Sequence, residues 1–150
     1  MTVVLSEHKI LESLTSNEKQ ILDFMYRWSR PIRAGDLSNR LSIKHTTLNS
    51  QLQLLEEKAL ILWERYRTVS LTESGEKIAA HLVRHHRLLE SFFYEHLHMN
   101  VEEAHMESMR IFPYVSCNLI YSVSQTVKGK KVCPCGYPIP ESDSCVPEKK

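Results

Sequence analysis

The stretch Arg33–Leu60, RAGDLSNRLSIKHTTLNSQLQLLEEKAL, decides the fold of this chain. Its apolar residues return at helical spacing in two runs, first Ala34, Leu37 and Leu41 and then Leu48, Leu52 and Leu55. A polar break at Ser42–Lys44 separates the two runs. Because two short amphipathic helices joined by a tight turn are typical of a helix-turn-helix, the stretch predicts that motif.

The segments on either side extend the motif. Upstream, Thr15–Glu18 has the capping-box pattern that starts a helix, Pro31 ends that helix, and its apolar stripe is Ile21, Leu22, Met25 and Trp28. Downstream, Leu60–Trp63 and Thr68–Leu71 have the composition of two short strands, and a cationic link joins them. Helices followed by such a hairpin predict a winged helix-turn-helix.

The outward side of the second helix carries hydrogen-bonding side chains and no acidic ones. In a winged helix-turn-helix this helix enters the major groove of DNA and the wing contacts phosphates. The residues predicted to contact DNA are Lys44, His45, Thr46, Thr47, Asn49, Ser50, Arg65 and Arg67. The alternative is a winged helix that serves as a protein–protein module, but the basic wing favours DNA.

The next part of the chain predicts two antiparallel helices. Thr72 is placed to cap a long helix that runs to about Leu97, and a second helix follows at about Val101–Phe112. The expected inner faces are formed by Ala79, Leu82, Val83, Leu89, Phe93 and Leu97 on the first helix and by Val101, Ala104, Ser108 and Phe112 on the second.

Polar residues interrupt both apolar faces. His86 and Glu90 lie one turn apart on the long helix, while His105 and Met109 lie on the second helix. Such a set suits Fe(II), Mn(II) or Zn(II). A salt-bridged His–Glu pair is the alternative, and packing or solvent exposure is the interpretation given to His81, His85, His96 and His98.

Composition limits the classes of protein. The chain has 150 residues, 42% of them hydrophobic, with a formal net charge of +1, which argues against a uniformly basic nucleic-acid binder. The longest apolar run, Ala59–Trp63, is far too short to span a bilayer, so we expect no membrane association and a cytoplasmic location. In that reducing compartment cysteines are thiols or ligands rather than disulfides.

From about Thr15 to Pro140 the chain resembles the diphtheria toxin repressor and manganese transport regulator family of metal-activated dimeric repressors. The stretches that carry the resemblance are the helix-turn-helix quoted above, VSLTESGEKIAAHLVRHHRLLE (69–90), HMESM (105–109) and GYPIP (136–140). The resemblance implies a DNA-binding domain, a helical dimerisation domain and a transition metal that stabilises the DNA-binding form. Many members have a further SH3-like domain, for which this chain is too short.

The resemblance matches some of the family's metal ligands but not others. His86, Glu90 and His105 match family ligands, and Met109 stands where the family has Cys or Glu. One turn further on, the family has Glu and His where this chain has Phe112 and Pro113, which bind no metal, and Ser16 stands near the family's N-terminal ligand. The resemblance therefore implies that one family site is kept and that the other is lost.

The C-terminal stretch KKVCPCGYPIPESDSC (130–145) contains three of the four cysteines. One hypothesis joins Cys117, Cys133, Cys135 and Cys145 as ligands of zinc or of an iron–sulfur cluster that acts as the sensor. The alternative is that the three tail cysteines are reduced surface thiols. A thiol oxidoreductase is not expected, because no thioredoxin-like order of strand and helix precedes the Cys-Pro-Cys motif.

We therefore expect a mainly α protein with a winged helix-turn-helix domain over residues 1–74, a helical metal-binding and dimerisation domain over 75–128, and a Cys/Pro-rich segment over 129–150. The expected function is that of an iron- or manganese-dependent transcriptional repressor, not an enzyme. It would bind double-stranded operator DNA as a homodimer and control genes of metal homeostasis. The alternative is a DNA-binding redox sensor that uses the cysteines.

Overall fold

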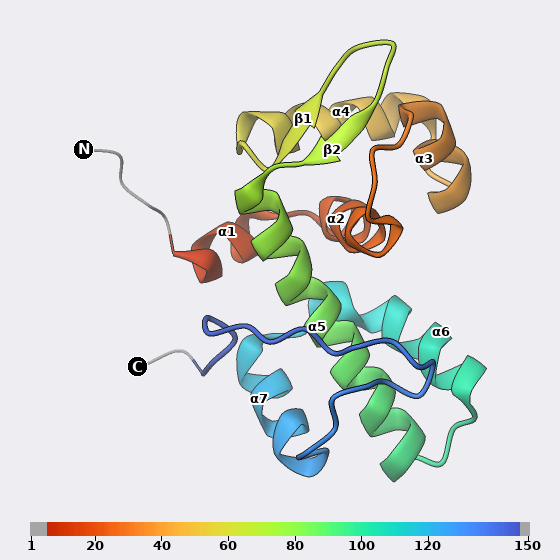
Figure 1. Cartoon of the computed structure of the whole chain (residues 1–150), viewed down its shortest axis with the longest axis vertical. Coiled ribbons are helices and arrows are strands. Elements are labelled where there is room, and N and C mark those ends of the chain that lie inside the picture. Colours follow the sequence, from red (N-terminus) through yellow and green to blue (C-terminus); the bar gives the residue numbers. More distant parts are fainter. Residues whose placement is uncertain (1–5, 148–150) are drawn as a thin grey trace. The chain divides into compact units, whose positions relative to one another are not determined.

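A computed structural model of the chain describes residues 6–147 (Figure 1). The described part is mainly helical, as the sequence predicts. Contacts divide it into two units, the first ending at Ala79 and the second beginning at Ala80. None of the helices in the described range has the length and apolarity needed to cross a membrane.

The first unit is the predicted winged helix-turn-helix. Its elements are α1 (Glu7–Ser13), α2 (Ser16–Trp28), α3 (Ala34–Leu41), α4 (His45–Glu57), β1 (Ile61–Trp63) and β2 (Val69–Leu71). The two strands pair antiparallel, with Ile61 opposite Leu71. The core is formed by side chains that are almost fully buried, namely Ile21, Leu22, Leu37, Leu48, Leu52, Leu55, Leu60 and Val69.

The capping box predicted at the start of α2 is present. The Thr15 hydroxyl oxygen accepts from the Glu18 amide at 3.1 Å, and the Glu18 carboxylate accepts from the Thr15 amide at 3.1 Å. Glu18 is fully buried, and Lys58 Nζ lies 2.8 Å from its second carboxylate oxygen. The buried charge is thus paired as well as hydrogen-bonded, which offsets its cost of desolvation.

The LTESG segment (71–75) forms the junction between the wing and α5 (Glu73–His96). The Thr72 hydroxyl accepts from the Gly75 amide at 3.0 Å and donates to the Ala59 carbonyl at 2.7 Å, so Thr72 caps α5 as predicted. A Cβ atom on residue 75 would lie 1.8 Å from the Leu60 carbonyl oxygen. Only glycine therefore permits this close approach of α5 to the backbone just before β1.

The second unit consists of the rest of α5, then α6 (Val101–Ile111), a 3₁₀ turn (Phe112–Tyr114), α7 (Cys117–Thr126) and an irregular C-terminal segment. Most of the expected inner face of α5 is buried, but Leu97 is 51% exposed because the helix ends before it. Val101 is 39% exposed since it occupies the first position of α6. These two placements in the core were wrong.

The C-terminal segment crosses over α5, as Figure 1 shows. Arg84 Nη1 donates to the Pro140 carbonyl at 3.2 Å and Arg87 Nη1 to the Pro138 carbonyl at 2.6 Å. The Arg87 guanidinium also lies 5.3 Å from the ring centroid of Tyr137. Because these prolines present their carbonyls to two arginines of one helix, the GYPIP stretch is fixed on α5 and brings the flanking cysteines toward it.

Candidate metal centres

Three of the four residues predicted as metal ligands come together on α5 and α6. Glu90 Oε2 lies 3.8 Å from His86 Nε2 and 3.6 Å from His105 Nδ1. The donor atoms of the three residues all lie within 4.8 Å of one another. We call this group the carboxylate centre. Two of the donors lie one turn apart on the same face of α5, and α6 supplies the third from the opposing helix face.

The electrostatics of the carboxylate centre are those of an unsatisfied anionic pocket. Glu90 is fully buried, yet its Oε2 atom and His105 Nδ1 make no hydrogen bond within residues 6–147. Burial raises the pKa of Glu90, but the interactions with His105 and the Cys135 thiol outweigh it and hold that pKa below its usual value. Glu90 is therefore held in its ionised form, and its Oε2 atom, which accepts no hydrogen bond, can coordinate a cation.

Sulfur atoms lie at the edge of this centre. The Cys135 thiol donates to Glu90 Oε1, and burial together with the Glu90 carboxylate raises the pKa of Cys135 to about 12. Met109 is half-buried on α6, one turn beyond His105 and thus on the same face of the helix. The donor set around Glu90 therefore combines a carboxylate, two imidazoles and nearby sulfur.

The position beyond Met109 carries no ligand. Phe112 is 1% exposed, and its ring centroid lies 5.8 Å from that of His86. Pro113 follows in the same 3₁₀ turn and is also buried. An apolar ring thus occupies the place where the family resemblance expects a ligand.

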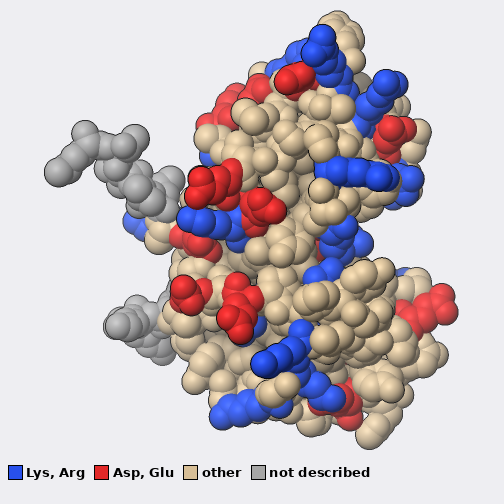
Figure 2. All heavy atoms as spheres, in the orientation of Figure 1, with Lys and Arg blue, Asp and Glu red and all other residues tan. Residues whose placement is uncertain are grey.

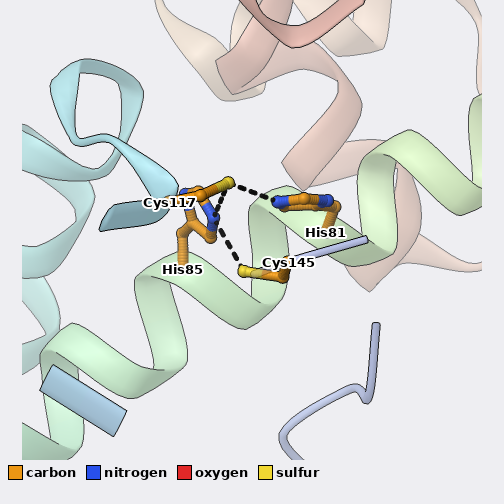
Figure 3. Close-up of side chains that lie close together, drawn as sticks. All are labelled: His81, His85, Cys117 and Cys145. Atoms are coloured by element: carbon orange, nitrogen blue, oxygen red, sulfur yellow. Dashed lines mark hydrogen bonds between the residues drawn. The ribbon is translucent and has the colours of Figure 1, made fainter. Parts of the chain in front are cut away.

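A second group combines two histidines of α5 with two of the cysteines predicted as ligands, a combination that the sequence did not predict (Figure 3). We call it the thiolate centre, and its residues are His81, His85, Cys117 and Cys145. His81 Nε2 lies 3.1 Å from Cys117 Sγ, and His85 Nε2 lies 3.2 Å from Cys145 Sγ and 3.6 Å from Cys117 Sγ. All four side chains are buried, and their donor atoms lie within 4.8 Å of one another.

The surroundings of the thiolate centre favour ionised sulfur and oriented imidazoles. Hydrogen bonding to Cys117, followed by hydrogen bonds to His81 and His85, outweighs burial and lowers the pKa of Cys145 to about 2. The Ser142 and Ser144 hydroxyls lie 3.5 Å and 3.3 Å from His81 Nδ1, on the ring nitrogen that faces away from the sulfur.

The structure does not bring the four predicted cysteines together in one group. Within the described residues, Cys117 and Cys145 join two histidines, whereas Cys135 contacts Glu90. Cys133 is buried but belongs to neither group. No disulfide joins the described cysteines.

The histidines of the thiolate centre could have been found from one signal. His81 and His85 have the same one-turn spacing as His86 and Glu90, which places both on one face of α5. Their sulfur partner Cys145 lies 60 positions beyond His85 in an irregular segment, where no periodicity points to it. The other two histidines set aside with them, His96 and His98, are exposed.

The residues predicted to contact DNA lie on the first unit. Along α4 and its N-cap, all are exposed except Thr47, which is half-buried. In the wing, Arg65 lies 3.2 Å from Glu56 and stacks over the Trp63 ring, while the exposed Arg67 lies 3.8 Å from Glu64. Exposed ion pairs of this kind are worth little, so phosphates can compete for both arginines. Figure 2 shows Lys and Arg side chains around the tip of the hairpin, with a few acidic ones among them.

Comparisons with known proteins agree on one family. Residues 72–141 match the family described as iron dependent repressor, metal binding and dimerisation domain. The chain is 35% identical over 60 residues to the HTH-type transcriptional regulator MntR of Lysinibacillus sphaericus, covering 40% of this chain and 43% of that regulator. It is 29% identical over 96 residues to MntR of Geobacillus thermodenitrificans, covering 64% and 67%.

Solved structures extend the likeness to the whole fold. The manganese regulator SloR has a TM-score of 0.73 at 27% identity over 85% of this chain and 61% of its own. A manganese-dependent transcriptional repressor in complex with manganese has a TM-score of 0.75 at 26% identity over 88% and 62%. The chain thus spans less than two thirds of these structures and less than half of the first MntR relative.

Proposed function

The chain belongs to the diphtheria toxin repressor and manganese transport regulator family of metal-dependent transcriptional repressors, and on this premise we propose that it is itself a metal-responsive repressor. In this proposal a homodimer binds double-stranded operator DNA and controls genes of metal homeostasis. The metal is Fe(II) or Mn(II), and the same residues can also bind Zn(II).

One observation carries the proposal. The Glu90 Oε2 and His105 Nδ1 atoms face each other at 3.6 Å, buried and without hydrogen-bond partners in the described structure. A packing-only role for these residues would leave both polar atoms unsatisfied, which native proteins rarely tolerate. A cation between them explains both atoms at once.

The residues proposed to hold the ion are His86, Glu90, His105 and Met109. Borderline nitrogen and oxygen donors suit Fe(II), Mn(II) and Zn(II), and a bound ion would contribute positive charge beside Glu90. His86 and Glu90 come from α5 and the other two from α6, so a filled centre joins two helices. Since α5 begins in the first unit at Glu73, the joined helix continues into the DNA-binding unit.

The DNA contacts in this proposal come from α4 and the wing. Asn49 and the residues at the start of α4 face solvent and can read base edges, while Lys44, Arg65 and Arg67 contact phosphates. A symmetric dimer would place two such helices in successive major grooves. The alternative of four cysteines around one cluster is not favoured, because Cys135 contacts Glu90 while Cys117 and Cys145 lie with two histidines in the described structure.

The experiment is a measurement of DNA affinity with and without metal. Fluorescence anisotropy with an operator selected from random DNA is performed on the metal-free protein and after addition of Mn(II) or anaerobic Fe(II). We expect metal to tighten binding by roughly 5- to 150-fold, the usual range for allosteric coupling. His86→Gln abolishes this gain, whereas His96→Gln, the same change at an exposed site on α5, retains it.

Two results would overturn the proposal. One is DNA binding by the wild-type protein that does not change on addition of either Mn(II) or Fe(II). The other is a metal response that survives in His86→Gln. Asn49→Ala serves as a check on the DNA side, because it removes a base-reading group without touching the metal residues and should weaken binding in both metal states.

A further inference from the structure

The thiolate centre has no part in the proposed function and so requires its own explanation. His85 and His86 are consecutive on α5, yet His85 lies with two cysteines and His86 lies beside Glu90. The two sulfurs come from different elements, Cys117 from the first residue of α7 and Cys145 from the C-terminal segment. Three separate parts of the second unit therefore converge on one buried point.

The distances within the thiolate centre are those of ligands around a single ion. A tetrahedral zinc ion with Zn–S of about 2.3 Å and Zn–N of about 2.0 Å places neighbouring donors roughly 3.3 to 3.8 Å apart. Of the nitrogen–sulfur separations, 3.6 Å lies within this range, 3.1 and 3.2 Å lie just below it, and all the donor atoms lie within 4.8 Å of one another, so a small outward shift of two donors would accommodate the ion. A two-iron cluster would spread its ligands over two metal atoms and needs a wider set.

Two of the donors are oriented or activated by their surroundings, and all four are buried. The hydroxyls of Ser142 and Ser144 lie at His81 Nδ1, which leaves Nε2 directed at the sulfur; ligating histidines usually have such a partner on the other nitrogen. Cys117 is the first residue of α7, where the positive end of the helix stabilises a thiolate. Burial of all four side chains excludes water from the ligand sphere.

We propose that His81, His85, Cys117 and Cys145 form a closed four-coordinate site for zinc, and that this ion fastens the C-terminal segment to α5 and α7. Two thiolates neutralise the charge of the divalent ion, which suits a buried position. With four protein ligands the site has no open coordination position, a feature of structural zinc sites rather than catalytic ones. Manganese, which prefers oxygen donors, is disfavoured here.

This site has a consequence for the neighbouring centre. The segment that supplies Cys145 also supplies Cys135, whose thiol donates to Glu90. Zinc at the thiolate centre would hold that segment in place and so keep Cys135 against Glu90. The zinc site stands independently of the proposed function, because it rests on different residues.

Metal analysis of the full chain, purified anaerobically under reducing conditions and dialysed against a weak chelator, tests the proposal. We expect a single zinc ion per chain in the wild type. Cys117→Ser and Cys145→Ser lose that ion. Cys133→Ser, which changes a buried cysteine outside the group, and His86→Gln both retain it.

A second measurement covers the case in which the serine variants fail to fold. Titration of the zinc-free wild type with Co(II) should give the visible bands of a tetrahedral complex and a thiolate-to-cobalt charge-transfer band. Zinc displaces the cobalt and abolishes both. His86→Gln should give the same spectrum, which assigns the bands to the thiolate centre.

Several outcomes would overturn the proposal. They are a wild type that holds no zinc and gives no charge-transfer band with cobalt, a Cys145→Ser protein that keeps its zinc, and iron accompanied by acid-labile sulfide at the cysteines. A Cys117–Cys145 disulfide found by mass spectrometry in the reduced preparation would equally exclude a zinc site.

Discussion

The carboxylate centre and the thiolate centre share helix α5, where the consecutive residues His85 and His86 belong to different centres, yet they differ in chemistry and in access. The carboxylate centre has one carboxylate and two imidazoles, and its His105 side chain is 38% exposed. The thiolate centre has two sulfurs and two imidazoles, all of them buried. Helix α5 supplies an imidazole and the carboxylate to one centre and two imidazoles to the other, while α6 adds an imidazole to the first and α7 and the C-terminal segment add the sulfurs to the second.

In our proposals this difference lets one helix serve two ions with separate roles. An oxygen-containing, partly exposed set suits Mn(II) or Fe(II) and allows exchange with solvent, as a sensor requires. A closed sulfur-containing set suits zinc that is retained, as a structural site requires. We therefore expect changes at one centre to alter regulation and changes at the other to alter stability.

The largest expected effect is on stability when zinc is removed. At a free zinc concentration about 1,000 times the dissociation constant, binding to the folded state adds about 4 kcal/mol to the free energy of unfolding. We expect urea unfolding of the wild type to lose stability of this order when zinc is chelated. In Cys145→Ser, zinc should add nothing to the free energy of unfolding. If chelation leaves the stability of the wild type unchanged, the thiolate centre is not a structural zinc site and does not differ in role from the carboxylate centre.

The next effect is on metal affinity at the carboxylate centre. Glu90→Gln removes the only carboxylate of that centre, and we expect its affinity for Mn(II) to fall roughly 100-fold, about 2.8 kcal/mol. Calorimetric titration measures the change. The zinc content of the thiolate centre should stay at the wild-type level, and its loss in this variant would show that the two centres are not independent.

The sequence predicted the elements that local patterns encode. The capping box at Thr15 and Glu18, the cap at Thr72 and the polar break between α3 and α4 all depend on residues a few positions apart. For the same reason, exposure was misjudged at helix ends such as Leu97, where the periodic pattern continues but the helix does not.

The carboxylate centre could be predicted from the sequence and the thiolate centre could not, because only the first depends on regular helical spacing. His86, Glu90 and His105 interrupt apolar faces at regular spacing and also match a family motif, so the sequence brings them together. The thiolate centre depends on where an irregular segment folds back, and hydrogen bonds from Arg84 and Arg87 to proline carbonyls determine that path. Such contacts join positions more than fifty residues apart and leave no periodic trace.

A smaller effect concerns metal preference. The Cys135 thiol donates to Glu90, so a soft donor lies beside the carboxylate centre. We expect Cys135→Ser to lower the affinity of this centre for Zn(II) by roughly 10-fold while leaving Mn(II) binding little changed. Competition titrations with the two ions measure the preference. Cys133→Ser is the matched control, and an equal loss for both ions would contradict a role for the sulfur.

Met109 offers a still smaller change. Met109→Leu nearly conserves volume and should cost less than about 1.5 kcal/mol of stability. Because a thioether is a weak neutral donor, we expect the affinity for Fe(II) to fall by less than roughly tenfold. Met106→Leu on the exposed side of α6 should leave affinity unchanged. If Met109→Leu binds like the wild type, the ligand set is limited to His86, Glu90 and His105.

The smallest effect is the pH dependence of the metal-free protein. The pKa of Glu90 lies below its ordinary 4.5 because the interactions with His105 and Cys135 outweigh burial. A lowered pKa means that ionised Glu90 contributes stability above pH 4.5 and that this contribution is lost as the pH falls through the folded-state value. The stability difference between wild type and Glu90→Gln should therefore shrink on acidification.

Urea unfolding of the two metal-free proteins between neutral and acidic pH measures this difference, with Glu102→Gln on the exposed side of α6 as a control for general charge effects. A gap that widens toward acid would mean that Glu90 is protonated in the folded protein at neutral pH. The carboxylate centre would then lack the negative charge expected of a cation site. It could no longer be distinguished from a His–Glu pair that serves only in packing.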